Sequence, residues 1–458
     1  MATDTHDVVV VGGGTAGCFA AATAAREGLD VVLLERKPAA EAGHIACGDA
    51  IKGATAFPDV IDREYLRAEA VSNGNVERAV FENPVSGDSL EVSFGDESGV
   101  VLDRKRYGEV LLEEVGRLGA RTRYDTVVND VVQDDDGRVT GVRTVRNGDA
   151  RTVEAEVVID AAGSLSILQD RADFSDATVD TDVSYRQFCS AYREIVTVEE
   201  PVPWDDAIVF RPAEELGYLW YFPRTPTEIN VGVGFQMTED PMTLVEVLRN
   251  DLRERDEFRG ARVEDKLGAA LPTRRPYDSA VAPGYVAAGD AAGHVNPTTG
   301  GGIAGAAKAG TWAAEVAVEA VGDGTVDETA LWEYNRRVMT DFGKRFAAMD
   351  LYNVFGTAHD VDELAAVVAA MPGQQLVDAV GRRGTADMGL RLKVETLLRT
   401  WGHWGLLYEL YRVHRKAEEL KAVYDDYPTT PAGFEDWRAD RDAVVRDVYG
   451  IAGAEPKY

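Results

Sequence analysis

Cysteines and long apolar runs are scarce in this chain of 458 residues, and each scarcity excludes a class of structure. The three cysteines, Cys18, Cys47 and Cys189, form neither a disulfide framework nor a Cys-x-x-Cys metal site. We therefore expect a reducing, cytoplasmic environment and no bound metal ion. No run of about 18 uncharged apolar residues occurs, so the sequence predicts no membrane-spanning helix.

Positive charge is also in deficit, and lysine in particular is rare. The chain has 48 Lys and Arg against 79 Asp and Glu, a formal net charge of −31, and only ten of the basic residues are lysine. Binding to nucleic acid needs a basic surface, so nucleic acid is excluded as a partner. An acidic surface with little lysine suits a cytoplasm rich in salt, where screening weakens the repulsion between carboxylates. We expect a halophilic source.

A glycine-rich turn separates the first strand-like segment from a helix-like segment, residues 16–27. Gly12, Gly14 and Gly17 fit the pattern G-x-G-x-x-G. In this pattern the first glycine makes a tight turn, the second lets the main chain approach a diphosphate, and the third lets the helix pack closely on the strand. Glu35 ends the next strand, where its carboxylate can accept hydrogen bonds from ribose hydroxyls. The segment predicts a dinucleotide with an unphosphorylated ribose, either FAD or NAD.

A second glycine-rich element follows the apolar segment at residues 285–288. Asp290 can bond a ribityl hydroxyl of FAD. The glycines at 300–302 place main-chain amides at the start of a helix, where their dipoles can stabilise an anionic reduced ring. A third apolar segment, residues 157–159, also ends in a small-residue turn. Three such turns in this order favour FAD over NAD.

The pattern along the chain predicts a mixed α/β and α+β fold. A discontinuous, Rossmann-like FAD-binding domain carries an inserted antiparallel-sheet substrate domain, and a helical region follows. The FAD-binding parts are predicted at residues 1–75, 101–180 and 267–328, the substrate sheet at 76–100 and 181–266, and the helical region at 329–458.

This combined pattern resembles the p-hydroxybenzoate-hydroxylase-type flavoproteins and, among them, the geranylgeranyl reductase family, which includes archaeal digeranylgeranylglycerophospholipid reductases. Two further segments carry the resemblance. Residues 35–49 contain a Glu…Pro…Cys-Gly pattern similar to the family's, and residues 217–224 match its Tyr-x-Trp-x-Phe-Pro-Lys/Arg motif. The resemblance spans residues 7–350. Residues 55–100 depart from the family pattern, and the helical tail is longer than usual.

Carried over position by position, the resemblance implies a set of FAD contacts. These are Ala16, Glu35, Cys47, Gly48, Arg104, Val128, Asp290, Gly302 and Ile303. Val128 is aligned only by its spacing from residues 119–120.

The resemblance also implies a reductase that saturates carbon–carbon double bonds of geranylgeranyl chains, those of archaeal membrane lipids foremost. Reduced flavin would deliver hydride to one carbon while the protein supplies a proton to the other. Cys47 is the first candidate for the proton donor and Tyr218 the second, and a packing role for Cys47 against FAD stays open. Trp220 and Phe222 would line the prenyl slot together with Tyr218, and Arg224 would contact a lipid phosphate.

Other interpretations remain open at this point. The 218–224 motif could be a half-buried strand with aromatic cross-strand pairs. A flavin monooxygenase or halogenase of the same fold is the rival enzyme, although halogenases carry Trp-x-Trp-x-Ile-Pro where this chain has Tyr218 and Phe222. A menaquinone side-chain reductase and a non-enzymatic prenyl-lipid carrier are further alternatives. The substrate would be a prenyl lipid or a quinone, and the electron donor a ferredoxin or NAD(P)H.

An aromatic, apolar face with helical spacing runs along the tail, and it favours either packing on the FAD domain or peripheral contact with the inner face of the cell membrane. Its members are Leu390, Val394, Leu397, Trp401, Trp404, Tyr408 and Tyr411.

Overall fold

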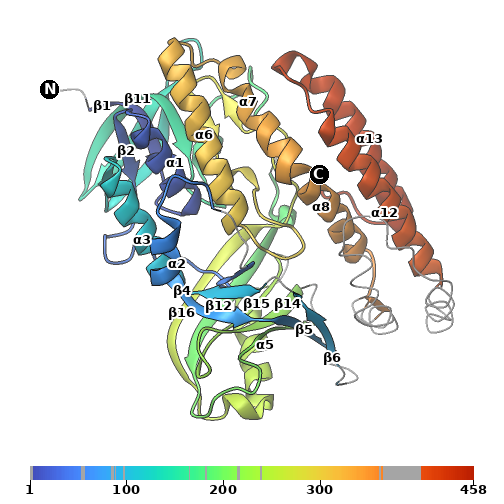
Figure 1. Ribbon diagram of the computed structural model, residues 1–458. Helices are drawn as coiled ribbons and strands as arrows, with labels where there is room; N and C mark the ends of the chain where they lie inside the picture. The colour runs from blue at the N-terminus through green and yellow to red at the C-terminus, as the bar shows by residue number, and fades with distance from the viewer. Residues whose placement is uncertain are drawn as a thin grey trace.

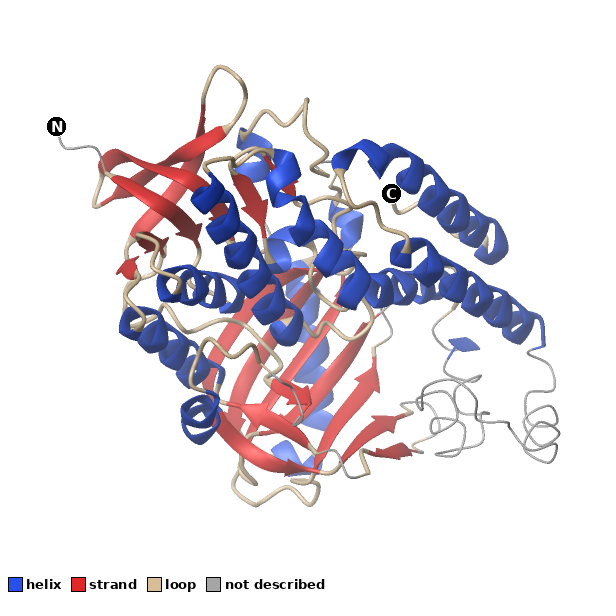
Figure 2. Ribbon diagram, turned by 45° about the horizontal axis from the view of Figure 1, so that its top comes forward, coloured by secondary structure: helices blue, strands red, loops and turns tan. Residues whose placement is uncertain are grey.

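The computed structural model describes residues 4–458 apart from 53–56, 84–86, 88, 96–97, 165, 181–182, 214–216, 238–239, 361–362 and 365–403. Two large sheets stack along one side of the molecule, and long helices lie beside them (Figure 1). Figure 2 shows the strands gathered in these two blocks with the C-terminal helices to one side.

The first sheet has eight strands and contains the opening βαβ unit. Its strand order is β17-β18-β11-β1-β2-β8. In addition, β10 pairs with β11, and β9 pairs with β10. The strands adjoining β1, namely β11 and β2, are both parallel to it, and the paired segments 8–11, 31–34 and 157–159 are apolar and buried because helices cover the sheet. The strands are β1 Thr5–Val11, β2 Val31–Leu34, β8 Arg121–Arg123, β9 Thr126–Gln133, β10 Val139–Arg146, β11 Asp149–Asp160, β17 Val281–Ala282 and β18 Tyr285–Ala287.

The second sheet has seven strands in the order β16-β12-β15-β14-β13-β5-β6. Its pairs are antiparallel except β13 with β5, because β5 arrives from a distant segment of the chain. One face packs on helix α5 (Pro241–Glu254), and the other faces the first sheet (Figure 1). The strands are β5 Arg78–Glu82, β6 Ser89–Ser93, β12 Phe188–Thr197, β13 Ala207–Pro212, β14 Gly217–Pro223, β15 Glu228–Gln236 and β16 Arg262–Pro272.

A third, three-stranded sheet lies at the junction of the other two. It comprises β3 (Ala50–Lys52), β7 (Gly99–Leu102) and β4 (Val71–Val76). The sequence pattern assigned residues 76–100 to the substrate sheet together with residues 181–266. Strands β5 and β6 join the seven-stranded sheet, whereas β7 pairs with β3 and β4.

The helices divide into those that cover the first sheet and those of the tail. Helices α1 (Thr15–Arg26) and α6 (Ile303–Asp323) cross each other beside the first sheet (Figure 1). The others are α2 Arg63–Ala70, α3 Arg104–Arg117, α4 Leu168–Arg171, α7 Glu328–Val338, α8 Lys344–Thr357, α12 Trp404–Asp425 and α13 Phe434–Ala452, with a π-helix at Met339–Gly343 between α7 and α8.

The mixed α/β class with a helical C-terminal region is confirmed. Within the helical region a short 3-10 helix at Pro431–Gly433 separates α12 from α13. Strands β7 and β16 run across the boundaries predicted at 100 and 266. Helices α2 and α5 were not anticipated. The division of the chain into cofactor and substrate domains stays a prediction.

Candidate cofactor and active site

The carboxyl ends of four neighbouring strands meet at one edge of the first sheet. Val11 pairs with Leu34 and with Asp160, and Asp160 pairs with Ala287. The three glycine turns predicted from the sequence, together with Glu35, therefore follow these strands side by side. In open α/β sheets this edge is where ligands bind.

Steric contacts explain two of the three motif glycines in the first turn. Gly12 has a φ of +99°, and a β-carbon there would lie 2.4 Å from the carbonyl oxygen of Ala161. A β-carbon at Gly17 would lie 1.9 Å from the carbonyl oxygen of Gly12, so only glycine lets α1 sit this close to the strand end. Gly14, at the N-cap of α1, has open space beside it, with its nearest neighbour, Ile45, 3.9 Å away.

Glu35 is buried beside this turn. Its Oε2 accepts a hydrogen bond of 2.7 Å from the main-chain N–H of Gly13, and its Oε1 accepts one of 2.8 Å from Lys37 N–H. Each carboxylate oxygen has a second lone pair, so both can accept further bonds from hydroxyls. The carboxylate thus lies against the glycine turn, as a ribose contact requires.

The two helices that begin at this edge start differently from four other helices, α2, α3, α5 and α7. Helices α1 and α6 have glycine at the N-cap, no side-chain cap and no acidic residue in the first turn. In α2, α3, α5 and α7 an aspartate caps the free N–H groups. An anion bound at the start of α1 or α6 would accept hydrogen bonds from the free N–H groups, as these carboxylates do in the other helices. The diphosphate and the anionic reduced ring of FAD are two such anions.

Arg104, at the start of α3, is a buried cation beside α1. It is 4% exposed, and its Nη2 donates to Thr15 Oγ1 at 3.4 Å. Its Nη1 has no hydrogen-bond partner, and none of the ion pairs in the described part of the chain includes Arg104. A buried guanidinium without a counter-ion is costly, so this donor fits an anionic group of the cofactor.

Asp290 and the start of α6 lie across from α1. Ser164 Oγ donates to Asp290 Oδ2 at 3.2 Å, and burial raises the pKa of this carboxyl. A β-carbon at Gly302, the N-cap of α6, would lie 3.6 Å from Asp290 Oδ1. Ile303 is the first residue of α6. Asp290 and the start of α6 are therefore adjacent, as a shared contact with the ribityl chain and the flavin ring of FAD would require.

Ala16 and Val128 complete the predicted cofactor set. Ala16 lies at the crossing of α1 with α6, where a β-carbon at Gly310 would come within 2.1 Å of its carbonyl oxygen. Val128 is half-buried on β9, two residues beyond Thr126, whose N–H donates to the carbonyl of Glu35. Val128 therefore lies on the strand whose first residue, Thr126, is hydrogen-bonded to Glu35.

The Cys47–Gly48 segment contacts the seven-stranded sheet. A β-carbon at Gly48 would lie 3.1 Å from the Phe222 ring and 3.5 Å from Trp220 Nε1. The Sγ of Cys47 accepts a hydrogen bond of 3.2 Å from Asp49 N–H. Burial raises the pKa of the Cys47 thiol, so the thiol keeps its proton at neutral pH. The site thus brings residues of the predicted cofactor and substrate parts into direct contact.

Alternate side chains of β14 form an aromatic face on the inner side of this sheet. Trp220 and Phe222 pack with Val76 and Val101, and Tyr218 lies at the edge of this cluster. The intervening residues of β14 point to the other face of the sheet. The hydroxyl of Tyr218 donates to the carbonyl of Thr299 at 2.7 Å, which ties β14 to the glycine-rich loop before α6.

Arg224 is buried in an ion pair rather than facing an open slot. Its Nε and Nη2 both donate to Asp49 Oδ2, at 2.9 and 2.6 Å. Asp49 is 1% exposed and Arg224 is 7% exposed. A contact between Arg224 and a lipid phosphate would require breaking this pair, so the geometry gives Arg224 a role in holding the Cys47–Asp49 segment.

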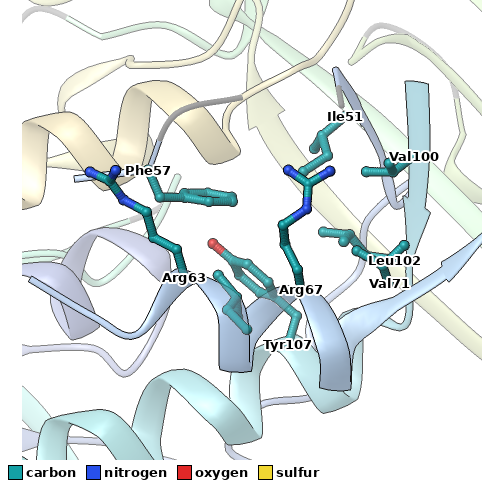
Figure 3. A pocket seen from close by; sticks show the side chains of 9 residues that line it. Ile51, Phe57, Arg63, Arg67, Val71, Val100, Leu102 and Tyr107 are labelled. Carbon is teal, nitrogen blue, oxygen red and sulfur yellow. The ribbon is translucent and has the colours of Figure 1, made fainter. Parts of the chain in front are cut away.

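A small cavity behind the three-stranded sheet does not belong to this site. It has a volume of about 70 Å³ and lies between α2 and β7, with the hydroxyl of Tyr107 pointing into it (Figure 3). Val100 and Leu102 line it, whereas Val101 between them packs on the aromatic face. This volume holds a few water molecules and is too small for a prenyl chain.

Asp49, Asn230 and Asp160 are site residues that sequence reasoning missed. Asp49 and Asn230 link the Cys47 segment to β14 and β15. Asp160 ends β11, and burial raises the pKa of its carboxyl, which accepts from Ser166 and Tyr285 hydroxyls. One signal was available, since asparagine is unfavourable inside a strand that is otherwise apolar.

Comparisons with known proteins agree with this geometry. Residues 7–215 match the family model described as FAD dependent oxidoreductase. A digeranylgeranylglycerophospholipid reductase of Methanothrix thermoacetophila is 30% identical over 86% of this chain and 96% of its own length. One from Sulfolobus acidocaldarius is 26% identical over 96% of this chain and 98% of its own.

Among solved structures, a geranylgeranyl bacteriochlorophyll reductase-like protein from Thermoplasma acidophilum shares the fold. It superposes with a TM-score of 0.73 at 22% identity, over 91% of this chain and 100% of the other. The cofactor edge, the sheets and the similarity over nearly the whole length lead to one assignment. The chain belongs to the digeranylgeranylglycerophospholipid reductase family and is an FAD-dependent oxidoreductase.

Proposed function

We propose that this protein reduces the carbon–carbon double bonds of geranylgeranyl chains in archaeal membrane lipids. The observation that carries the proposal is the contact between Gly48 and the aromatic face formed by Trp220 and Phe222. An apolar aromatic wall beside the Cys47 thiol suits an unpolarised alkene, which offers no group for hydrogen bonding. The names of the relatives support the same substrate class.

The chain supplies binding, exclusion of water and a proton. Reduced FAD, held along the edge from Glu35 to Gly302, would supply the hydride for one alkene carbon and would itself be oxidised. The aromatic side chains of β14 hold the prenyl chain and keep water away. The thiol of Cys47 gives its proton to the other carbon, since its raised pKa keeps it protonated. Tyr218 is the weaker candidate because its hydroxyl already donates to Thr299.

The direct test uses the purified protein under anaerobic conditions. Dithionite-reduced holoprotein is incubated with a digeranylgeranyl glycerophospholipid, and the lipid is analysed by mass spectrometry. Mass gains in multiples of two hydrogens support the proposal. Reduction of menaquinone alone would assign the quinone reaction instead, and an oxygenated or halogenated product formed with O₂ would assign the rival enzyme class. A protein that stays colourless near 450 nm after FAD is added would favour the lipid carrier.

The same assay identifies the electron donor. Reduced ferredoxin and NAD(P)H each replace dithionite in parallel reactions. Lipid reduction with one donor and not with the other assigns the physiological class of donor.

We also propose that α12 rests on the membrane surface from which the lipid is taken. Within the described residues no helix is long and apolar enough to cross a bilayer. Trp404, Tyr408 and Tyr411 are 48%, 64% and 54% exposed and recur at intervals of four and three residues, which places them along one side of α12. The other predicted members of this face, Leu390, Val394, Leu397 and Trp401, lie outside the described residues.

Vesicle flotation tests this contact. The wild type should float with vesicles of anionic archaeal lipid, and the triple variant W404S/Y408S/Y411S should remain in the dense fraction. Tyr185 is 60% exposed and belongs to a different element, the 3-10 helix Tyr185–Gln187, so Tyr185→Ser is the control and should float like the wild type. Equal flotation of all three proteins would refute the proposed surface.

A further inference from the structure

The segment from His44 to Asp49 is anchored at both ends to the seven-stranded sheet. At one end, His44 Nε2 lies 2.7 Å from Asp265 Oδ2 on β16, which also accepts from Arg193 on β12. At the other end, Asp49 accepts from Arg224 at 2.6 Å. This segment belongs to the cofactor part by chain order, but its side chains are fixed to the opposite sheet.

Asn230 lies where these anchors converge on Cys47. Its Nδ2 donates to the carbonyl oxygen of Cys47 at 2.8 Å and to Asp49 Oδ2 at 2.6 Å. Its Oδ1 accepts from the indole Nε1 of Trp220 at 2.9 Å. The side chain is 0% exposed. The side-chain amide of Asn230 therefore contacts the main chain of Cys47, the carboxylate of Asp49 and Trp220 of the aromatic face at the same time.

The three partners of Asn230 fix the orientation of its amide. The indole of Trp220 can only donate, and the Cys47 carbonyl and the Asp49 carboxylate oxygen accept. Only a side chain with one acceptor and two donors satisfies all three, and among short side chains that is asparagine. The strand around Asn230 is adapted to this contact, because a β-carbon at Gly232 would lie 2.2 Å from the indole of Trp220.

We propose that Asn230 is a positioning residue for the reduction, holding Cys47 and Trp220 in one fixed arrangement. The proposal rests on the proposed function for its kinetic part. Its structural part, control of the Cys47 segment, is independent of the substrate. Loss of the amide donors removes the hydrogen bond to the Cys47 carbonyl and leaves Arg224 as the remaining side-chain partner of the Asp49 carboxylate. The segment then moves away from the aromatic face. A misplacement of about 1 Å can lower a rate about 100-fold.

The experiment compares variants of the FAD-loaded holoprotein. Asn230→Asp keeps the shape but leaves at most one donor, because two buried carboxyls side by side can share one proton, and Asn230→Ser removes both amide donors and leaves one shorter hydroxyl. Asn335 provides the matched control because it is a buried asparagine in the other core. It is 1% exposed, accepts from Ala280 N–H at 3.0 Å and donates to Ser279 Oγ at 2.8 Å. Asn335→Asp should lower stability without affecting Cys47.

Two readouts separate positioning from a structural role. The first is the rate of Cys47 alkylation by iodoacetamide, followed by peptide mass spectrometry so that Cys18 and Cys189 are counted apart. The second is kcat and KM for lipid reduction. For both Asn230 variants we expect alkylation about tenfold faster and kcat about 10- to 100-fold lower, with KM within about threefold of the wild type. FAD content should be unchanged.

The outcomes are distinct. If Asn230→Ser alters only the unfolding midpoint, as Asn335→Asp does, the proposal is wrong and Asn230 is structural. If kcat falls but Cys47 alkylation does not change, the amide does not control the Cys47 segment and the proposal is again overturned. If the wild type reduces no prenyl lipid, the proposed function fails, while the alkylation rates still decide whether Asn230 positions Cys47.

Discussion

Replacing Gly310 by alanine tests the crossing of α1 and α6 on which the cofactor edge depends. A β-carbon at Gly310 would lie 2.1 Å from the carbonyl oxygen and 2.9 Å from the carbonyl carbon of Ala16. Both atoms belong to the main chain of α1, so no side-chain rotation relieves the overlap. The two helices must separate by more than about 1 Å to restore ordinary contact distances.

The same helix offers a matched control. A β-carbon at Gly322, near the end of α6, would meet nothing within 4 Å. Alanine there should stabilise the protein by about 0.5–1 kcal/mol through its helix propensity. At Gly310 the same gain is outweighed by overpacking of about 1–3 kcal/mol. We therefore expect the unfolding free energies of G310A and G322A to differ by about 2 kcal/mol, with G310A the less stable.

The assay is urea unfolding of both variants, together with FAD titration by quenching of flavin fluorescence. Since the crossing also places Ala16 beside Gly289, G310A should bind FAD about tenfold more weakly, equivalent to ~1.4 kcal/mol. G322A should bind FAD as the wild type does. Equal stability and equal FAD affinity of the two variants would show that α1 and α6 do not approach this closely, and the described cofactor edge would be wrong.

Four other predictions follow from the site. Arg104→Met should weaken FAD binding about 10- to 100-fold in the same titration, because a buried charge-assisted bond is lost, and Arg117→Met on the same helix should not. Cys47→Ser should lower kcat about 100-fold. Burial raises the pKa of the Cys47 thiol, and only the protonated thiol can donate a proton. The wild-type rate of reduction should therefore stay level through neutral pH and fall only above the ordinary cysteine pKa of about 8.5. A fall in rate at acidic pH would contradict this. Arg224→Met should cost about 3–5 kcal/mol in urea unfolding by leaving the buried Asp49 unpaired, and the double variant D49N/R224M should recover most of that loss. Equal losses in the single and double variants would show that the pair is not buried as described.

Local sequence patterns were sufficient to predict the cofactor edge. Gly12, Gly17 and Glu35 lie within one βαβ unit, where spacing along the chain determines spacing in the structure. Asp290 was predictable for the same reason, because it directly follows a buried strand that pairs with β11. Each prediction needed only a strand, a turn and a helix in sequence order.

The contacts of Arg224 could not be predicted in this way. Arg224 and Asp49 are 175 residues apart, and their pairing depends on how the seven-stranded sheet lies on the first. From sequence alone an arginine after an aromatic strand suggests phosphate binding as readily as a buried ion pair. The same holds for Asn230, whose three partners come from two other segments of the chain.

The position of the Cys47 segment has a consequence for how substitutions act on this enzyme. The segment leaves the cofactor edge after β2, yet its hydrogen bonds run to β14, β15 and β16. The main-chain carbonyls of His44 and Asp49 accept from Lys37 and Leu102, but the side chains of both residues are bonded to the seven-stranded sheet. We therefore expect a change in the relative position of the two sheets to move Cys47 mainly with the aromatic face. Substitutions in the seven-stranded sheet should accordingly lower the rate of reduction without loss of FAD, whereas those at the α1–α6 crossing should release FAD first.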